Sequence, residues 1–551
     1  MKDARLFDAM SRIDDKYIDR SLNGISSGAY GDGNSQSPKR AVTLRRVLII
    51  AAVLILAVTI PVSVYIVGGR NRENKLDPDI TDSGIINTDM TSVPPVEPDK
   101  LAGLDFGGAE VNFYVGGYGA DNYHVRSISV EDGGSDPLDR AIIERNARVE
   151  KKLGVKINVR SADHSIKQTL YTRLLAGDTE NDIYGLVQYD DIGLCREGFF
   201  IDLDALADRG APYIDTYVGS GWDNDCIKTL TSGGLTYYLA GDLSLRYTGG
   251  AGVIFVNDAL YKDTLEDEIG SIYDLVRRGE WTYDKMLSIL PLCFEDSNGN
   301  NRADINSDRL SLLLSSTDDI SAMAIPAGVN FTSYDGETGY AQSAFNTGNR
   351  ALIDFLTNME LLQNTSGVYK SGADIKGKMN AFAEGKAVFA EGWMYYADTY
   401  LRNMKDTFSI IPCPKLSKDS EYRSALCGEV NIYAINAHIS DQRLQAAAAT
   451  LQALAEESYK SVRFEYFDSI TGGRYQTDGN MREMINIIYS GIHTDEMWVW
   501  QYDDSLADER MNRFSTVLLN AITNKNGINQ ITRNEDRLKS AFEKLMNDIR
   551  G

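Results

Sequence analysis

The sequence predicts an α/β fold with a mainly parallel sheet, preceded by a single transmembrane helix. The first observation is an apolar run at residues 47–67, which holds no charged side chain. The second is a series of strand and helix patterns that alternate from residue 104 onward. The third is length, since the roughly 450 residues from about 104 to 551 are enough for two lobes with a substantial buried core.

The apolar run at residues 47–67 is long enough to cross a membrane. As a helix it would measure about 31 Å, close to the roughly 30 Å of a bilayer's hydrocarbon core. It follows 46 mostly polar residues, and neither a small-residue cleavage site nor a lipid-anchoring cysteine closes it. Four basic residues crowd its front and three follow it, which favours a cytoplasmic N-terminus. We therefore expect an uncleaved single-pass anchor in the cell membrane with a large extracellular domain; cleavage just after the run is the alternative.

Residues 1–46 are then a cytoplasmic tail, and residues 68–103 a flexible linker outside the cell. The tail begins with an amphipathic helix, because residues 1–22 place apolar side chains at helical spacing among charges. This stretch is similar to tails on some membrane-anchored regulators of bacterial sigma factors, which implies a cytoplasmic partner. A helix lying on the inner leaflet is the other interpretation.

Composition excludes some classes of function. A net charge of −23 and an isoelectric point near 4.7 argue against a nucleic-acid partner, because nucleic acids bind basic surfaces. The five cysteines have no CxxC spacing, and we expect free buried thiols, with Cys413 and Cys427 the pair that could form a bridge. The four histidines lack metal-ligand spacing, and no HExxH, GxSxG or phosphate-loop motif occurs. We expect no enzyme, although hydrolysis by paired carboxylates stays open.

Strands and helices alternate from residue 104. Short apolar or alternating runs indicate strands, and apolar residues three and four apart indicate helices. Strand, helix, strand, helix and strand in succession predict an α/β lobe with a mainly parallel sheet. A helix after Trp281 and a helix-rich region close the chain. The predicted elements are strand 110–115, helix 139–153, strand 155–159, helix 166–175, strand 182–187 and strand 253–256.

An ordered series of segments carries a family resemblance. It includes LDFGGAEVNFYV, LDRAIIERNARVEKKLGVKI, LLAGDTENDIY, GWDNDCIKTLTSGGLTYYLAGDLSL, VIFVNDALYKD, GEWTYDKM, FAEGKAVFAEGWMYYADTYLRNMKDTFSIIPCPK and NIYAINAH. In this order they resemble the family 1 extracellular solute-binding proteins of bacterial ABC importers, above all the oligosaccharide-type members of Gram-positive bacteria. Most of those members are tethered by a lipidated cysteine, from which this chain departs at its N-terminus.

The resemblance implies a two-lobed, periplasmic-binding-protein-like fold of type II, with a hinge and an interlobe cleft. Lobe 1 would comprise residues of about 104–240 and 385–440, and lobe 2 residues of about 241–384 and 441–551. It also implies a carbohydrate ligand, held in the cleft by hinge closure and delivered to ABC permease subunits.

Sugars are bound by aromatic faces against C–H surfaces and by planar polar groups against hydroxyls. The segments that the family places near the cleft contain Trp222, Tyr237, Tyr238, Trp393, Tyr395 and Tyr396. Asp242 and Glu429 are the carboxylates expected to contact hydroxyl groups. We expect Trp222→Ala or Trp393→Ala to cost about 1–3 kcal/mol of binding. Packing inside the domain is the competing interpretation of every aromatic residue here.

A loop with alternating oxygen ligands predicts a structural Ca²⁺ site. Its ligands would be the side chains of Asp296, Asn298, Asn300 and Asp304 and the backbone carbonyl of Arg302. The loop resembles the calcium loop of alginate-oligosaccharide-binding members of the family. It departs from them because Ile305 stands where they place a carboxylate, and Ser307 rather than Glu occupies position 12. A solvated Asn/Gly-rich turn is the alternative.

Two classes of function follow from these observations. The first is a membrane-anchored solute-binding protein that captures a carbohydrate, with an oligosaccharide favoured, for ABC-type import. The alternative is a single-span ligand sensor that signals through its N-terminal cytoplasmic tail. A carbohydrate-active enzyme is a third class, which an assay of sugar hydrolysis would test.

Overall fold

The computed structural model describes residues 99–550, with gaps at 118–122, 131–133, 135, 163–165, 218, 316, 338–339, 504–512 and 525. These residues belong to one compact unit, Val93–Gly551. The expected tail at 1–46, the transmembrane helix at 47–67 and nearly all of the linker at 68–103 lie outside the described residues. Among the residues that the structure describes, no helix combines the length and the apolar character that a membrane crossing requires.

The first sheet has the strand order β12-β3-β1-β2. Both β2 and β3 run parallel to β1, and β12 pairs antiparallel with β3. Helices α4 and α5 connect the parallel strands, so the predicted succession of strands and helices is confirmed. The bounds are β1 (Ala109–Gly116), α4 (Pro137–Leu153), β2 (Val155–Ala162), α5 (Lys167–Leu175), β3 (Ile183–Val187) and β12 (Asn431–Ile435).

Local chemistry fixes the ends of α4. The side chain of Asp136 accepts a hydrogen bond from the Asp139 N–H, and proline occupies the first helical position. Gly154 ends the helix in the left-handed region, with φ of 61°. A side chain at this position would also collide with the Asp105 carboxylate, since a Cβ would lie 2.0 Å from Oδ1. Gly154 therefore fixes the direction in which the chain leaves α4 and enters β2.

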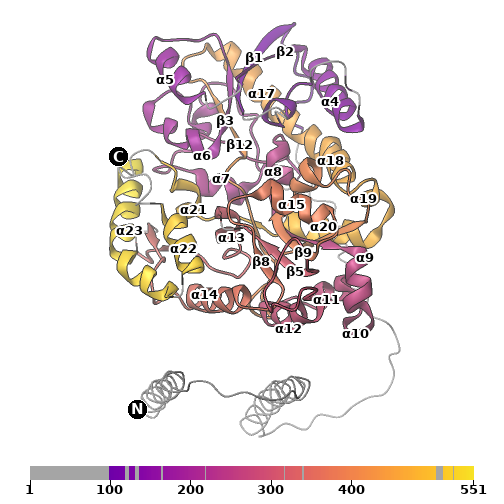
Figure 1. Ribbon diagram of the computed structural model, residues 1–551. Helices are drawn as coiled ribbons and strands as arrows, with labels where there is room; N and C mark the ends of the chain where they lie inside the picture. Colours follow the sequence, from indigo (N-terminus) through magenta and orange to yellow (C-terminus); the bar gives the residue numbers. More distant parts are fainter. Residues whose placement is uncertain are drawn as a thin grey trace, which may run out of the picture. The chain divides into compact units, whose positions relative to one another are not determined.

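The second sheet has the strand order β10-β4-β9-β5-β8. Strands β8 and β9 run parallel to β5, whereas β4 is antiparallel to both β9 and β10. Helices α12, α14 and α15 pack on this sheet, which lies below the first sheet in Figure 1. The bounds are β4 (Gly252–Asn257), α12 (Tyr283–Cys293), β5 (Leu310–Leu314), α14 (Arg350–Gln363), β8 (Val368–Lys370), α15 (Ile375–Ala383), β9 (Ala387–Trp393) and β10 (Phe408–Pro412).

The lobe boundaries differ from those expected. Strands β9 and β10, which lie in the range 385–440 assigned to lobe 1, pair instead with β4 and β5 of the second sheet. Helix α17 (Asp441–Glu457), assigned to lobe 2, packs against β1 and α4 of the first sheet. The reason is strand pairing: all seven residues of β9 are buried, and its backbone is hydrogen-bonded on both sides within the second sheet.

Two segments connect the sheets and run side by side in opposite directions. Leu239 forms a bridge with Tyr433 of β12, and Ala251, directly before β4, forms a bridge with Leu426. The N–H of Cys427 donates to the Gly250 carbonyl over 2.9 Å. Helix α8 (Leu245–Gly249) lies within the first of these crossing segments, residues 239–251, and the second is residues 426–433. The α/β class and the arrangement of two sheets joined by crossing segments thus agree with the expectation.

The buried apolar side chains form two clusters. The smaller one packs between the first sheet and α17, with Phe113 and Leu444 fully buried. The larger one runs without interruption from Leu186 of the first sheet to Phe255 and Phe389 of the second. All five cysteines are free and buried, so the prediction of free thiols is confirmed and Cys413 and Cys427 form no bridge.

The remaining elements are short, apart from a group of C-terminal helices. They are α3 (Tyr123–Arg126), α6 (Gln188–Asp191), α7 (Asn224–Leu230), α9 (Asp258–Tyr261), α10 (Asp267–Ile269), α11 (Ile272–Arg277), α13 (Asp318–Ala322), β6 (Thr332–Tyr334), β7 (Ala341–Ser343), α16 (Tyr396–Tyr400), β11 (Ser424–Ala425), α18 (Arg463–Ile470), α19 (Arg474–Thr477), α20 (Gly479–Ser490), β13 (Ile492–His493), α21 (Glu496–Trp500), α22 (Phe514–Thr523) and α23 (Gly527–Arg550), with 3₁₀ turns at Ile192–Glu197 and Leu203–Leu206 and π-helical turns at Lys262–Glu266 and Ser458–Val462.

Candidate binding site where the two sheets meet

The carboxyl ends of the parallel strands in both sheets point to the crossing segments. In the first sheet, β3 ends at Val187 opposite Asn431, where the second crossing segment enters β12. In the second sheet, β9 ends at Trp393 opposite Gly252, where the first crossing segment enters β4. Ligands of open α/β sheets bind beyond the carboxyl ends of the strands, so the junction of the two sheets at the crossing segments is the candidate binding site.

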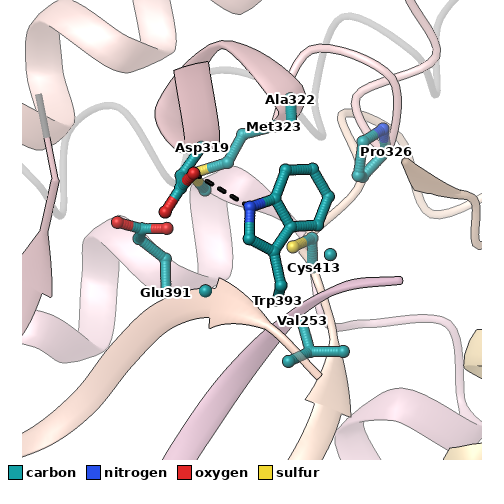
Figure 2. Close-up of a pocket in the computed structure, with 10 residues that line it drawn as sticks. Val253, Asp319, Ala322, Met323, Pro326, Glu391, Trp393 and Cys413 are labelled. Atoms are coloured by element: carbon teal, nitrogen blue, oxygen red, sulfur yellow. Dashed lines mark hydrogen bonds between the residues drawn. The ribbon is translucent and has the colours of Figure 1, made fainter. Parts of the chain in front are cut away.

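A small pocket lies at the carboxyl end of β9 (Figure 2). It is lined by Gly252, Val253, Asp319, Ala322, Met323, Pro326, Glu391, Gly392, Trp393 and Cys413. The space open to a water-sized group is about 10 Å³, roughly what one water requires. The pocket in this conformation is therefore much smaller than a sugar ring.

Two aromatic residues donate to one carboxylate at this pocket. Trp393 Nε1 donates to Asp319 Oδ1 over 2.9 Å, and the Tyr396 hydroxyl donates to Asp319 Oδ2 over 2.8 Å. Figure 2 shows the first of these bonds, with the indole ring lying across the pocket. Burial raises the pKa of Asp319, and the neighbouring negative charge of Glu391 raises it further. Asp319 thus binds both rings to the start of α13.

A buried ion pair lies beside Asp319. Lys378 is fully buried, and its Nζ donates to Glu391 Oε1 over 2.6 Å and to the Glu391 carbonyl over 2.8 Å. The Ser315 N–H donates to the same Oε1 over 2.6 Å. Glu391 is 2 % exposed, and its second oxygen receives no hydrogen bond from any residue that the structure describes. The group therefore holds two carboxylates and one lysine.

Arg246 organises a second set of side chains at the same junction. Its guanidinium lies 3.9 Å from the ring centroid of Tyr395 and 4.9 Å from that of Tyr123. Its Nη2 lies 3.9 Å from Glu429 Oε2, to which the Tyr395 hydroxyl donates over 3.4 Å. The Glu429 side chain is 42 % exposed, so this carboxylate is open to solvent and to a ligand.

His124 lies close to this set and is neutral near pH 7. Its Nδ1 is 2.9 Å from Asn431 Oδ1, and the side chain is almost completely buried. Burial lowers the pKa of His124 to about 4, and the positive charge of Arg246 acts in the same direction. The imidazole therefore adds no charge to the junction.

Asp242 lies in a different environment from the one expected for a sugar contact. It is 2 % exposed and accepts a hydrogen bond from the Tyr489 hydroxyl over 2.7 Å, and its Oδ2 lies 3.6 Å from Arg463. The Arg463 guanidinium lies 3.8 Å from the ring centroid of Tyr459. Burial raises the pKa of Asp242 to about 6, against the opposing effect of Arg463. Asp242 thus holds α18 and α20 to the first crossing segment, and it does not line the pocket.

Three expected aromatic contacts also lie away from the pocket lining. Trp222 is 6 % exposed, donates to Gln452 Oε1 over 3.0 Å and packs on Tyr433 in the smaller core cluster. Tyr238 is fully buried and donates to the Ile192 carbonyl over 2.9 Å. Tyr237 is partly buried against the larger cluster. Packing is the interpretation that fits these three, because none of them is hydrogen-bonded to a residue that lines the pocket.

The structure therefore brings together four of the eight expected ligand residues, namely Trp393, Tyr395, Tyr396 and Glu429. It adds Asp319, Glu391, Lys378 and Arg246, which were not expected. One of these carried a signal, because Glu391 is an acid inside the otherwise apolar strand AVFAEGW. A carboxylate in a fully buried strand needs a partner. Asp319 and Arg246 carried none, since charged residues are common at helix starts.

The expected calcium loop forms a series of turns held by its own side chains. Asp296 accepts hydrogen bonds from the N–H groups of Gly299, Asn300 and Asn301 at 2.7, 3.1 and 2.6 Å. Among the described residues, no three or more His, Cys, Asp or Glu side chains are grouped closely enough to hold a metal ion. Asp308, which the sequence reasoning missed, accepts from the N–H groups of Ser297 and Asp304 and closes the loop.

Comparisons with known proteins gave structural likenesses only. No model of a protein family and no curated protein matches the chain. The chain is similar to the ABC substrate-binding protein Lmo0181 of Listeria monocytogenes in complex with cycloalternan, at 12 % identity and a TM-score of 0.48, over 79 % of this chain and 99 % of that one. It is also similar to UgpB of Mycobacterium tuberculosis in complex with glycerophosphocholine, at 14 % identity and 0.48, over 80 % and 99 %.

A third likeness is to the cyclic α-maltosyl-1,6-maltose binding protein of Arthrobacter globiformis, at 14 % identity and a TM-score of 0.48, over 80 % of this chain and all of that one. All three TM-scores lie below 0.5, so these likenesses assign no function to the chain.

Proposed function

We propose that this chain is a solute-binding protein that captures a carbohydrate, without converting it, where the two sheets meet. The observation that carries the proposal is the run Trp393, Tyr395 and Tyr396 at the carboxyl end of β9. Each of these rings is held by a charged side chain, through Asp319 for Trp393 and Tyr396 and through Arg246 for Tyr395. Aromatic faces beside fixed carboxylates are what a polyhydroxylated ring requires of a site.

Binding on this proposal exchanges internal partners for ligand hydroxyl groups. Asp319 already accepts two hydrogen bonds, and the half-exposed Glu429 lies within reach of Arg246. The pocket has space for only one water, so a sugar enters when α13, which carries Asp319, moves away from β9. Hydroxyl groups then replace the Trp393 and Tyr396 donors at Asp319, and return of the elements around the ligand excludes water. The mechanism is non-covalent capture.

The test is a thermal-shift screen of the purified full-length chain against neutral and charged oligosaccharides. A ligand at 100 times its Kd adds about 2.7 kcal/mol of stability, which a melting curve resolves. Trp393→Ala should abolish the shift. The matched control is Tyr334→Ala, because Tyr334 is a 61 % exposed aromatic residue on the β6–β7 hairpin. Silence across the library, or an equal loss in both variants, would contradict the proposal.

We propose further that residues 47–67 anchor the protein in the cell membrane, with the tail at 1–46 in the cytoplasm and the described domain outside. Delivery of the ligand to ABC permease subunits is the role that the family resemblance implies, and the anchor itself favours neither import nor sensing. The amphipathic pattern of residues 1–22 supports the alternative, a sensor whose tail contacts a cytoplasmic partner. Ligand uptake by cells that produce the protein without residues 1–22 separates the two roles. A transport role predicts that uptake survives this deletion, whereas a signalling role predicts that the response to the ligand is lost.

A structural Ca²⁺ in the loop around Asp296 remains a proposal. The oxygens of Asp296, Asn298, Asn300 and Asp304 and the Arg302 carbonyl are of the type that calcium prefers, and Asp308 supplies a further carboxylate nearby. Calcium should raise the melting temperature of the native chain and leave that of Asp296→Ala unchanged. An equal response of both proteins would rule the loop out as the site.

A further inference from the structure

Hydrogen-bond donors around the pocket beside Trp393 are bonded to Asp319 or Glu391, whereas one acceptor oxygen receives no hydrogen bond from the described residues. Trp393 Nε1 and the Tyr396 hydroxyl both donate to Asp319. Lys378 Nζ and the Ser315 N–H both donate to Glu391 Oε1. Glu391 Oε2 receives no hydrogen bond from the described residues, although the residue lines the pocket and is 2 % exposed. A group that enters here therefore meets a free carboxylate oxygen.

The charges around the pocket do not balance. Asp319 and Glu391 carry two negative charges when both are ionised, and Lys378 supplies one positive charge. The other titratable groups that interact with this set are Tyr395, Tyr396, Cys413 and Cys427, all neutral, because burial raises the pKa of each far above neutrality. One negative charge is left at a buried site, where an uncompensated charge is costly. The pocket thus favours a ligand group with positive charge.

The remaining walls fit a small cation. The indole of Trp393 lies across the pocket, and Ala322, Met323 and Pro326 close it on the apolar side (Figure 2). The face of a tryptophan ring attracts ammonium groups. The space of about 10 Å³ suits a water-sized group, and an ammonium group is of that size.

We propose that this pocket receives a protonated amino group of the ligand, next to Asp319, Glu391 and Trp393. This rests on the proposed function, in which the ligand is a carbohydrate, and it makes that ligand an amino sugar. A hydroxyl group donates one hydrogen bond and leaves the negative charge in place. An ammonium group donates three and neutralises it, so it satisfies both the free oxygen and the charge.

The test compares three probes by calorimetric titration of the full-length chain at pH 7: a glucosamine tetramer, its fully N-acetylated counterpart, and spermidine. The glucosamine tetramer should bind at least about tenfold more tightly than the acetylated one, because acetylation removes the positive charge. Asp319→Asn should abolish this preference. Glu384→Gln is the matched control, since it removes the same charge from a 62 % exposed side chain a few residues before β9 and should leave the preference unchanged.

Each outcome decides the inference. If the acetylated tetramer binds as tightly as the amine and Asp319→Asn changes neither affinity, the amine pocket is refuted while carbohydrate binding stands. If spermidine binds with loss in Asp319→Asn and neither tetramer binds, the pocket stands and the carbohydrate assignment fails. If no probe binds, the amine pocket is refuted, and the carbohydrate assignment is decided by the oligosaccharide library. The comparison of the two tetramers on the native chain needs no variant, so it holds even if Asp319→Asn does not fold.

Discussion

At the scale of single residues, comparison of Trp222 with Trp393 shows how a packing tryptophan differs from one at the proposed binding site. Both are 6 % exposed, and both indole N–H groups are hydrogen-bonded. The partner of Trp222 is Gln452 of α17, inside the smaller core cluster, whereas the partner of Trp393 is a carboxylate that lines the pocket. The two side chains therefore have different consequences when they are removed.

We expect Trp222→Ala to lower the free energy of unfolding by about 3–5 kcal/mol, because it leaves a large cavity in the core. The ligand affinity of the folded variant should equal that of the native chain, which revises the loss of binding expected from sequence. Urea unfolding and calorimetric titration measure the two quantities. A weaker affinity with unchanged stability would instead place Trp222 in contact with the ligand.

Asp242 makes stability depend on pH. Its pKa is raised to about 6 by burial, above the ordinary value of 3.8, so the folded state retains a proton that the unfolded state loses between these values. The folded state binds more protons, and the free energy of unfolding therefore falls as pH rises from about 4 to 6. The contribution of Asp242 is fully present below pH 4 and is lost as pH passes 6.

Asp242→Asn should remove this part of the pH dependence. Urea unfolding at pH 4, 5, 6 and 7 measures the slope for the native chain and the variant. Asp225→Asn is the control, because the Asp225 side chain is 82 % exposed and should leave the slope unchanged. Parallel slopes for the native chain and Asp242→Asn would show that this carboxyl titrates normally.

At the scale of elements, the ion pair of Lys378 and Glu391 fastens α15 to β9. Lys378→Met leaves the Glu391 and Asp319 carboxylates without their cation, at a cost of about 3–5 kcal/mol of unfolding free energy. The double variant Lys378→Met, Glu391→Gln removes both charges and should recover most of this loss. Urea unfolding of the native chain, both single variants and the double variant completes the cycle. A double variant as unstable as Lys378→Met would show that no such coupling exists.

Sequence patterns found β1, β2 and β3 of the first sheet because each is a short apolar or alternating run in its own right, although the sheet order β12-β3-β1-β2 does not follow the chain. Predicted strands at 110–115, 155–159 and 182–187 each lie within one residue of an observed strand at their start. The family resemblance, rather than a pattern, placed Trp393, Tyr395 and Tyr396 near the expected cleft. It could not place Asp319 or Arg246 beside them, because these residues come from α13 and α8, and no local spacing records which strand end those helices reach.

At the scale of the whole molecule, the lobe boundaries were the least predictable feature. Strand β9 pairs with β4, more than 130 residues earlier in the chain. The chain then returns to the first sheet at β12, and α17, which follows, packs on the same sheet. Such long-range pairing is set by which apolar faces complement each other in space. An assignment by continuous ranges therefore placed β9 and β10 in lobe 1 together with β12, of which only β12 pairs with the first sheet.

The larger core cluster makes the two sheets one cooperative unit. It joins Leu186 of the first sheet to Phe255 and Phe389 of the second through buried contacts, and the crossing segments bond to each other between them. Opening either sheet alone would expose side chains of the other. We therefore expect the described domain to unfold in a single calorimetric transition, with tryptophan emission and far-UV circular dichroism giving the same midpoint.

Trp222→Ala in the first sheet and Lys378→Met in the second provide the decisive comparison. Each should lower the midpoint of the whole transition, because each weakens a part on which the rest depends. Independent lobes would behave differently: calorimetry would resolve two peaks, Trp222→Ala would shift one and Lys378→Met the other. A single shared shift also bears on function, since it would mean that ligand contacts made at the end of β9 stabilise the first sheet as well.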